Sequence, residues 1–156
     1  MRNNYLIQTN FNDKKELIIF INKPIFFKKI IEKINPDNCV YIPELNLEKN
    51  IIKWPQKIEY EEIPKLSILN LPKLKIVQTW QLKNNILEGI IESYHNELHL
   101  FTIKLEGKII ESHCILIDFN AFWKHKHFMV PDFILPEIIN NLKKTIANVL
   151  DIKNTL

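Results

Sequence analysis

The clearest pattern in this chain is an alternation of apolar and polar positions that begins at residue 73. Four segments of strand length, at 73–82, 86–94, 98–105 and 108–118, are separated by Asn-Asn, His-Asn-Glu and Glu-Gly. Turn residues between alternating segments are typical of β-hairpins. The pattern therefore predicts an antiparallel meander of four strands with one buried face.

The predicted Glu-Gly turn at 106–107 sets the register of the last two strands. It places His99 opposite Cys114, and the preceding turn places Ile91 beside Phe101. A slip of one residue would exchange the two faces of a strand, so the gathering of apolar side chains on one face supports this register. The predicted buried face contains Leu87, Ile91, Phe101, Ile103, Leu105, Ile110, Cys114 and Leu116. The other face is expected to carry Glu88 opposite Lys104, together with Glu92, Thr102 and Glu111.

Two other segments have the period of an amphipathic helix. The first begins at Pro24, which suits a first helical turn, and the NPDN sequence at 35–38 ends it. Its apolar positions are Phe27, Ile30, Ile31 and Ile34. The second spans 136–150, with Glu137 in its first turn, where the helix dipole favours a carboxylate. Its apolar stripe consists of Ile138, Ile139, Leu142, Ile146, Val149 and Leu150.

Weaker patterns complete the predicted order of elements. The apolar run 15–22 is expected to be a buried strand, and short strands are expected near 39–42 and 57–63. A length of 156 residues suits one domain, 1–156, with a single core. The sequence thus predicts an α+β fold in which one helix follows the first strand and a long helix follows the meander.

This order of elements resembles the helix-grip superfamily of START, polyketide-cyclase and plant pathogenesis-related ligand-binding proteins. The resemblance covers most of 15–150 and is closest to an uncharacterised branch of cyanobacteria and plastids. Segments similar to IPKLSILNLPKLKIVQTWQLKN and LHLFTIKLEGKI occur there. The resemblance implies a curved antiparallel sheet wrapped around the C-terminal helix, with an apolar ligand between them. Helix-grip proteins usually carry two short helices after the first strand, whereas only one is expected here.

If the resemblance holds, the functional site is the space between the sheet and the last helix. The side chains expected to line it are Trp80, Ile91, His99, Phe101, Ile103, Cys114, Leu116, Leu142 and Ile146. The expected function is non-enzymatic: binding of a lipid, pigment or isoprenoid, or service as an assembly or scaffolding factor. A cavity above roughly 300 Å³ in this space would favour ligand binding.

Two other classes of function stay open. One is a small protein–protein interaction module, or a subunit of a larger complex, whose core is filled. The other is an enzyme of the cyclase or hydrolase kind with His99, Glu92 or His113 as acid–base groups, which would show as perturbed pKa values converging in the cavity. A thiolate beside a histidine can act as a nucleophile, but oxyanion donors and an orienting third residue are not evident near His99 and Cys114.

The other histidines do not predict a metal site. His95 and His99 are four residues apart on a hairpin, so they do not share a helix face as in HExxH. His125 and His127 are two apart and would point the same way on a strand. We expect instead that both are exposed in a solvated loop, and that the protein carries no metal and no cofactor.

Composition limits the partners. The 21 basic and 18 acidic residues are mixed along the chain, and Arg2 is its single arginine, whereas nucleic-acid binding favours clustered Lys and Arg. No apolar run approaches the roughly 18 residues of a membrane span, and the N-terminus lacks a signal-peptide pattern. Cys39 and Cys114 can form at most one disulfide, which favours a reducing compartment. We expect a soluble intracellular protein of the cytoplasm or plastid stroma that binds no nucleic acid.

Overall fold

The structure, a computed structural model, describes residues 1–34, 43–62, 72–111 and 114–151. In these residues six strands form one antiparallel sheet in the order β1-β8-β7-β6-β5-β4, and a small hairpin pairs β2 with β3. The elements are β1 (Arg2–Gln8), α1 (Lys14–Ile21), α2 (Pro24–Ile34), β2 (Leu45–Asn46), β3 (Ile51–Ile52), β4 (Gln56–Glu62), β5 (Leu74–Lys83), β6 (Ile86–His95), β7 (Leu98–Glu111), β8 (Cys114–Trp123) and α3 (Ile134–Asp151). The predicted α+β class, with a large antiparallel sheet and a long C-terminal helix, is confirmed.

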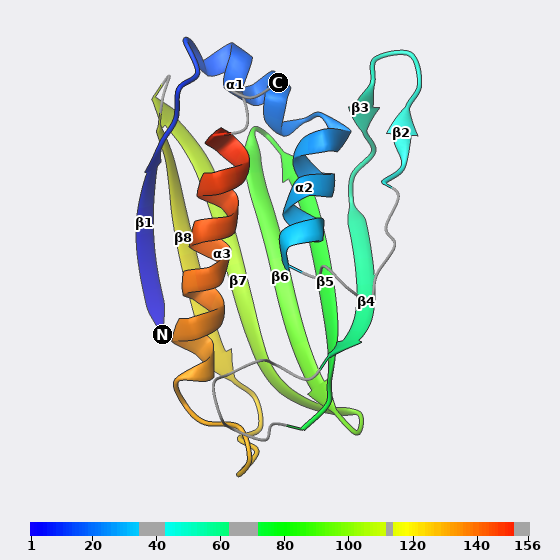
Figure 1. The fold of residues 1–156 in the computed structure, drawn as a ribbon, viewed down its shortest axis with the longest axis vertical. Coiled ribbons are helices and arrows are strands. Elements are labelled where there is room, and N and C mark those ends of the chain that lie inside the picture. Colours follow the sequence, from blue (N-terminus) through cyan, green and yellow to red (C-terminus); the bar gives the residue numbers. More distant parts are fainter. Residues whose placement is uncertain (35–42, 63–71, 112–113, 152–156) are drawn as a thin grey trace.

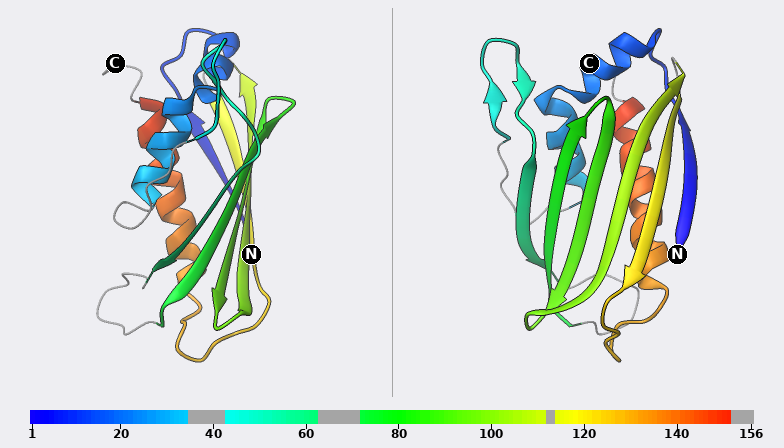
Figure 2. Two further views of the ribbon diagram at one scale, coloured as in Figure 1. Left: turned by 90° about the vertical axis from the view of Figure 1, so that its right-hand side faces the viewer. Right: turned by 180° about the vertical axis from the view of Figure 1, so that it is seen from behind.

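Helices cover only one face of the sheet. In Figure 1, α3 and α2 lie side by side across the strands, and Figure 2 shows the opposite face without a helix on it. We call the covered side, to which the buried Ile91 and Phe101 point, the inner face. The other side, which carries Glu92 and Lys104, is the outer face. The core lies between the inner face and the helices.

The run 15–22 is helical, so the strand predicted there is wrong. Two helices, α1 and α2, separate β1 from β2, where only one was expected. Asp13 caps α1 by accepting a hydrogen bond from the backbone N–H of Glu16 at 2.7 Å. In the sequence, this cap and the acidic residue in the first turn were the features that indicated a helix. The buried positions showed no helical period, because they lie in a continuous apolar run. They are Leu17, Phe20 and Ile21.

The first strand lies earlier in the chain than expected. β1 pairs antiparallel with β8, from Arg2 opposite Asn120 to Gln8 opposite Cys114. Because β1 is an edge strand, only Ile7 is deeply buried, and its apolar alternation is too weak to predict a strand. Of the two short strands expected elsewhere, β4 confirms the one near 57–63, and the one near 39–42 lies outside the described residues.

β7 is continuous, so the predicted turn at 106–107 is wrong. Gly107 pairs with Leu87 on one side and Ile117 on the other, and its φ is not positive. Glu-Gly between apolar positions fits a tight turn, but it fits an uninterrupted strand as well. β7 pairs with β6 over 98–108 and with β8 over 101–111, and the partners of Glu106 and Gly107 on both sides decide for the strand.

The other two predicted turns are present, but the second is formed by two residues and not by the predicted three, 95–97, because His95 pairs with Leu98. The β5–β6 turn has positive φ at Asn84 and Asn85, and the β6–β7 turn has positive φ at Asn96 and Glu97. Two successive residues with positive φ match the twist of paired strands, and asparagine tolerates this conformation better than most residues.

Because β7 continues through 106–107, the two faces of β8 are exchanged relative to the prediction. Phe101 lies opposite Trp123, and Cys114 lies opposite Glu111 instead of His99. Because neighbouring residues of a strand point to opposite faces, an odd change of register exchanges the faces. The inner positions of β8 are Ile115, Ile117, Phe119 and Ala121, and the outer positions are Cys114, Leu116, Asp118, Asn120 and Phe122. Ile110, also predicted to be buried, is exposed.

Between β6 and β7 the register differs from the prediction, but the faces do not. Ile91 lies opposite Ile103, two residues beyond the predicted Phe101, and Glu88 faces Glu106 instead of Lys104. An even shift leaves every side chain on its face. The prediction that Ile91, Phe101 and Ile103 share the buried face is therefore confirmed.

α3 lies across the inner face, as predicted (Figure 1). Its buried side chains include Leu142 and Ile146. Leu142 borders the same space as Phe101, and Ile146 borders a narrow gap beside Leu105 and Ile117. The predicted approach of these helix residues to Cys114 is wrong, because Cys114 belongs to the outer face.

Candidate functional site

A cavity of about 320 Å³ lies between the inner face, α2 and α3. The sheet supplies its floor, and Lys33 of α2 lies at one side. The floor residues are Tyr60, Ile76, Gln78, Ile91 and Phe101, and the residues from α3 are Ile138, Asn141, Leu142, Lys144 and Thr145. The remaining space under the helices is filled, since the gap beside Ile146 measures only about 10 Å³. The free volume is thus concentrated over β4 to β7.

A chain of buried polar side chains lies on the floor. The indole N–H of Trp80 donates to Oε1 of Gln78 at 2.8 Å, and Nε2 of Gln78 donates to the hydroxyl of Tyr60 at 2.8 Å. All three side chains are buried. Because burial without partners would be costly, these hydrogen bonds fix the amide of Gln78 in one orientation. The floor is therefore apolar with a rigid polar strip.

Ser93 adds a further polar group to the inner face, separate from the hydrogen-bonded chain of Trp80, Gln78 and Tyr60. It pairs with Ile76 of β5 and with Phe101 of β7, both of which line the cavity. Ser93 is fully buried, and its Oγ has no hydrogen-bond partner in the described part of the chain. An unpartnered buried hydroxyl costs about 1–3 kcal/mol, so it requires an explanation. A polar atom of a ligand is one such explanation.

The structure brings only some of the predicted site residues together. Ile91, Phe101 and Leu142 line the cavity. Three further candidates are buried: Trp80 and Ile103 on the inner face, and Ile146 on α3. Trp80 packs edge-on against Phe27 of α2. All three are buried in the same layer but do not border the cavity.

Three predicted site residues, His99, Cys114 and Leu116, do not face this space. Cys114 and Leu116 are on the outer face because the continuous β7 changes the register of β8 by an odd number of residues. His99 is there because of a β-bulge: Ser93 pairs with Phe101 and Tyr94 pairs with His99, which leaves one extra residue in β7. A bulge of this kind re-aims the side chains beyond it.

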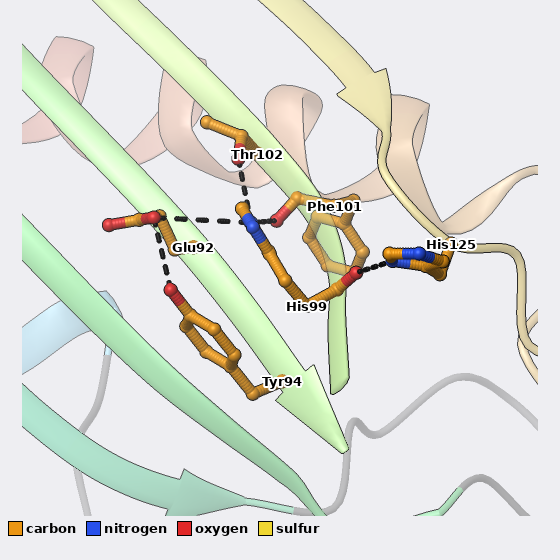
Figure 3. Close-up of polar contacts among 6 residues, drawn as sticks. All are labelled: Glu92, Tyr94, His99, Phe101, Thr102 and His125. Carbon is orange, nitrogen blue, oxygen red and sulfur yellow. Dashed lines mark hydrogen bonds and ion pairs between the residues drawn. The ribbon is translucent and has the colours of Figure 1, made fainter. Parts of the chain in front are cut away.

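On the outer face His99 joins a polar cluster (Figure 3). Its Nε2 lies 3.1 Å from the carbonyl oxygen of Phe101 and 2.8 Å from Oγ of Thr102. The same nitrogen is 4.0 Å from a carboxylate oxygen of Glu92, and the imidazole stacks on the ring of Tyr94 at 4.8 Å between centroids.

Tyr94 is held in its neutral form. Burial raises the pKa of Tyr94, and so does Glu92, whose carboxylate accepts a hydrogen bond from the phenol at 3.1 Å. A phenol that keeps its proton at neutral pH acts as a donor and not as a base. The enzyme alternative required acid–base groups in the cavity, but Glu92 and His99 meet on the outer face, and His113 is outside the described residues.

The remaining histidines lie at the end of the sheet. β8 ends before His125 and His127, so the strand geometry that would have aimed both in one direction is absent. Nδ1 of His125 lies 3.0 Å from the carbonyl oxygen of His99, whereas Nδ1 of His127 accepts from the N–H of Met129 at 3.1 Å. Within the described ranges, no group of three or more His, Cys, Asp or Glu side chains is placed to hold a metal ion.

Two wide hollows, of about 590 and 410 Å³, lie on the outer face. In the larger one, Glu88, Glu106 and Asp118 occupy neighbouring positions on three strands, flanked by Arg2 and Lys104. Interspersed charges of both signs are typical of a solvated sheet face. The cavity under α3 is smaller, but its apolar walls make it the candidate binding site.

No model of a known protein family matches the chain, and no curated protein matches it. Among the described helices, none is long and apolar enough to cross a membrane. A proposal about function therefore depends on the cavity.

Proposed function

We propose that this protein is a non-enzymatic binding protein of the helix-grip type that holds an apolar small molecule between its sheet and α3. The observation that carries the proposal is the cavity of about 320 Å³, which reaches the roughly 300–1,000 Å³ usual for ligand pockets. Ile91 and Phe101 below, and Ile138 and Leu142 above, give it apolar walls. Ile91, Phe101 and Leu142 are already buried, so among these four the partly buried Ile138 has the surface that an apolar ligand would remove from water.

The order of elements supports the helix-grip architecture. Two short helices follow β1, as that superfamily usually has, although the sequence alone indicated one. The first strand pairs with the last, and the long C-terminal helix lies across the sheet. A location in the cytoplasm or plastid stroma stays a prediction from the sequence.

A cavity-blocking variant tests ligand binding. Ile138 is partly buried and lines the cavity, so Ile138→Trp should occupy part of its volume. Asn140→Trp, on the exposed side of the same helix, is the matched control. Wild type and both variants are expressed in the organism that the protein comes from, purified and examined by native mass spectrometry. We expect a retained small molecule with wild type and Asn140→Trp, and its loss with Ile138→Trp. Retention by all three would contradict the proposal.

Protein binding is the second candidate function. Phe128, in the connection between β8 and α3, is 91% exposed, and Met129, Phe133 and Leu98 nearby in the sequence or fold are also exposed. Exposed apolar clusters commonly mark interaction sites. In the same mass spectra, an additional subunit that is lost with Phe128→Ser would support this alternative.

A further inference from the structure

The opening of the cavity carries positive charge. Lys33, in the last turn of α2, and Lys144 of α3 both line the cavity and are exposed. Among the described residues that line it, none is Asp or Glu. Since the walls behind them are apolar, the cavity has a cationic rim and an apolar interior.

Neither of these ammonium groups forms an ion pair or a hydrogen bond within the described residues, whereas other lysines of the same helices have a partner. Lys29 of α2 lies 3.6 Å from Glu32, and Lys143 of α3 donates to Oδ1 of Asn3 at 2.8 Å. Oppositely charged residues three or four positions apart stabilise a helix, but the corresponding positions around Lys144 are neutral. They are Asn140, Asn141, Ala147 and Asn148.

Local helix energetics explain only one of the two lysines. A cation in a last turn is favoured by the helix dipole, which accounts for Lys33. Lys144 lies in the body of α3, where the dipole has little effect, and its side chain borders the cavity. An anion at the opening would lie within reach of both helices.

We propose that the ligand is a single-chain amphiphile with an anionic headgroup, held by Lys33 and Lys144, with its apolar chain along Ile91 and Phe101. This proposal rests on the function proposed above and specifies the chemical class of the ligand. Lysine binds carboxylate and phosphate alike as a point charge, so both headgroups belong to this class.

The test compares ligands that share a chain and differ in the headgroup. Dodecanoate, dodecyl phosphate and dodecan-1-ol are titrated calorimetrically below their aggregation concentrations, at low and high salt. We expect the two anions to bind roughly tenfold more tightly than the alcohol at low salt, with the difference shrinking as salt screens the charges.

A matched pair of double variants assigns the preference to the cavity. Lys33→Gln with Lys144→Gln should remove the preference for anions, so that this variant binds the two anions and dodecan-1-ol with similar affinity. Lys29→Gln with Lys143→Gln removes the same charge from the same helices, away from the cavity lining, and should keep the preference.

The outcomes separate this proposal from the proposed function. Equal binding of acid and alcohol by the wild-type protein would overturn the anionic headgroup and leave apolar binding intact. An anion preference lost equally in both double variants would show general attraction to a basic surface and also overturn it. No binding of any ligand would reject the proposed function itself.

Discussion

Trp80 of β5 and Gly89 of β6 are direct cross-strand partners, and the indole ring of Trp80 occupies the space that a side chain at position 89 would need. A Cβ atom at Gly89 would lie 2.8 Å from Cζ3 of Trp80. The glycine is required here for close approach and not for an unusual backbone, since its φ is not positive. The ring in turn contacts Phe27 of α2, so this pair sets the distance between the sheet and the helix.

Gly89→Ala should therefore destabilise the protein by about 1–3 kcal/mol, because overpacking forces a buried ring out of position. Gly107→Ala is the control, since its Cβ would lie 3.6 Å from the nearest atom, on Ile115, an ordinary contact. Urea unfolding measures both free energies. Similar values for the two variants would mean that Trp80 does not occupy the position described.

The observed face of β8 is tested by two neighbouring residues. Ile117 is buried on the inner face, whereas Leu116, which the sequence pattern placed inside, lies on the outer face. Ile117→Asp should unfold the domain, because it buries an unpaired carboxylate. Leu116→Asp should leave a cooperative thermal transition. If Leu116→Asp were the variant that fails to fold, the register would follow the predicted turn at 106–107 after all.

The cavity itself predicts unequal costs for two leucines of α3. Leu142 borders the cavity, while Leu150 is packed in the core and does not. Replacing a packed leucine by alanine costs about 2–5 kcal/mol, and the cost depends on the void that remains. We expect Leu150→Ala to fall within this range and Leu142→Ala to cost clearly less. Chemical denaturation of both variants without added ligand provides the comparison. Equal losses would indicate that the space beneath Leu142 is filled.

Tyr94 predicts a pH dependence at alkaline pH. Burial and Glu92 raise the pKa of Tyr94 in the folded protein above the value of about 10 for an unfolded chain. As pH rises past this value, the unfolded chain releases the proton first, so the stabilising contribution is present below pH 10 and is lost above it. Thermal melts between neutral pH and pH 11 should show a steeper loss for wild type than for Tyr94→Phe. Parallel curves would exclude this contribution.

Local periodicity was sufficient for much of the architecture. Alternation predicted β4, β5, β6 and the first part of β7, a helical period predicted α2 and α3, and asparagines marked two turns. Because each pattern depends on neighbours along the chain, it also predicted correctly that Ile91, Phe101 and Leu142 face the buried layer. The same reasoning missed α1, since a continuous apolar run fits a helix and a strand equally well.

Only the tertiary structure decided which strands pair and in what register. A Glu-Gly pair can turn or continue, and the pairing of Glu106 and Gly107 with both β6 and β8 made the strand continue. One extra residue in β7 then moved His99 from the expected pocket to the outer face. Lys33 and Lys144 are more than a hundred positions apart in the sequence, and only packing of α2 beside α3 places both at one cavity. Register and site depend on long-range burial, which a short window of sequence does not contain.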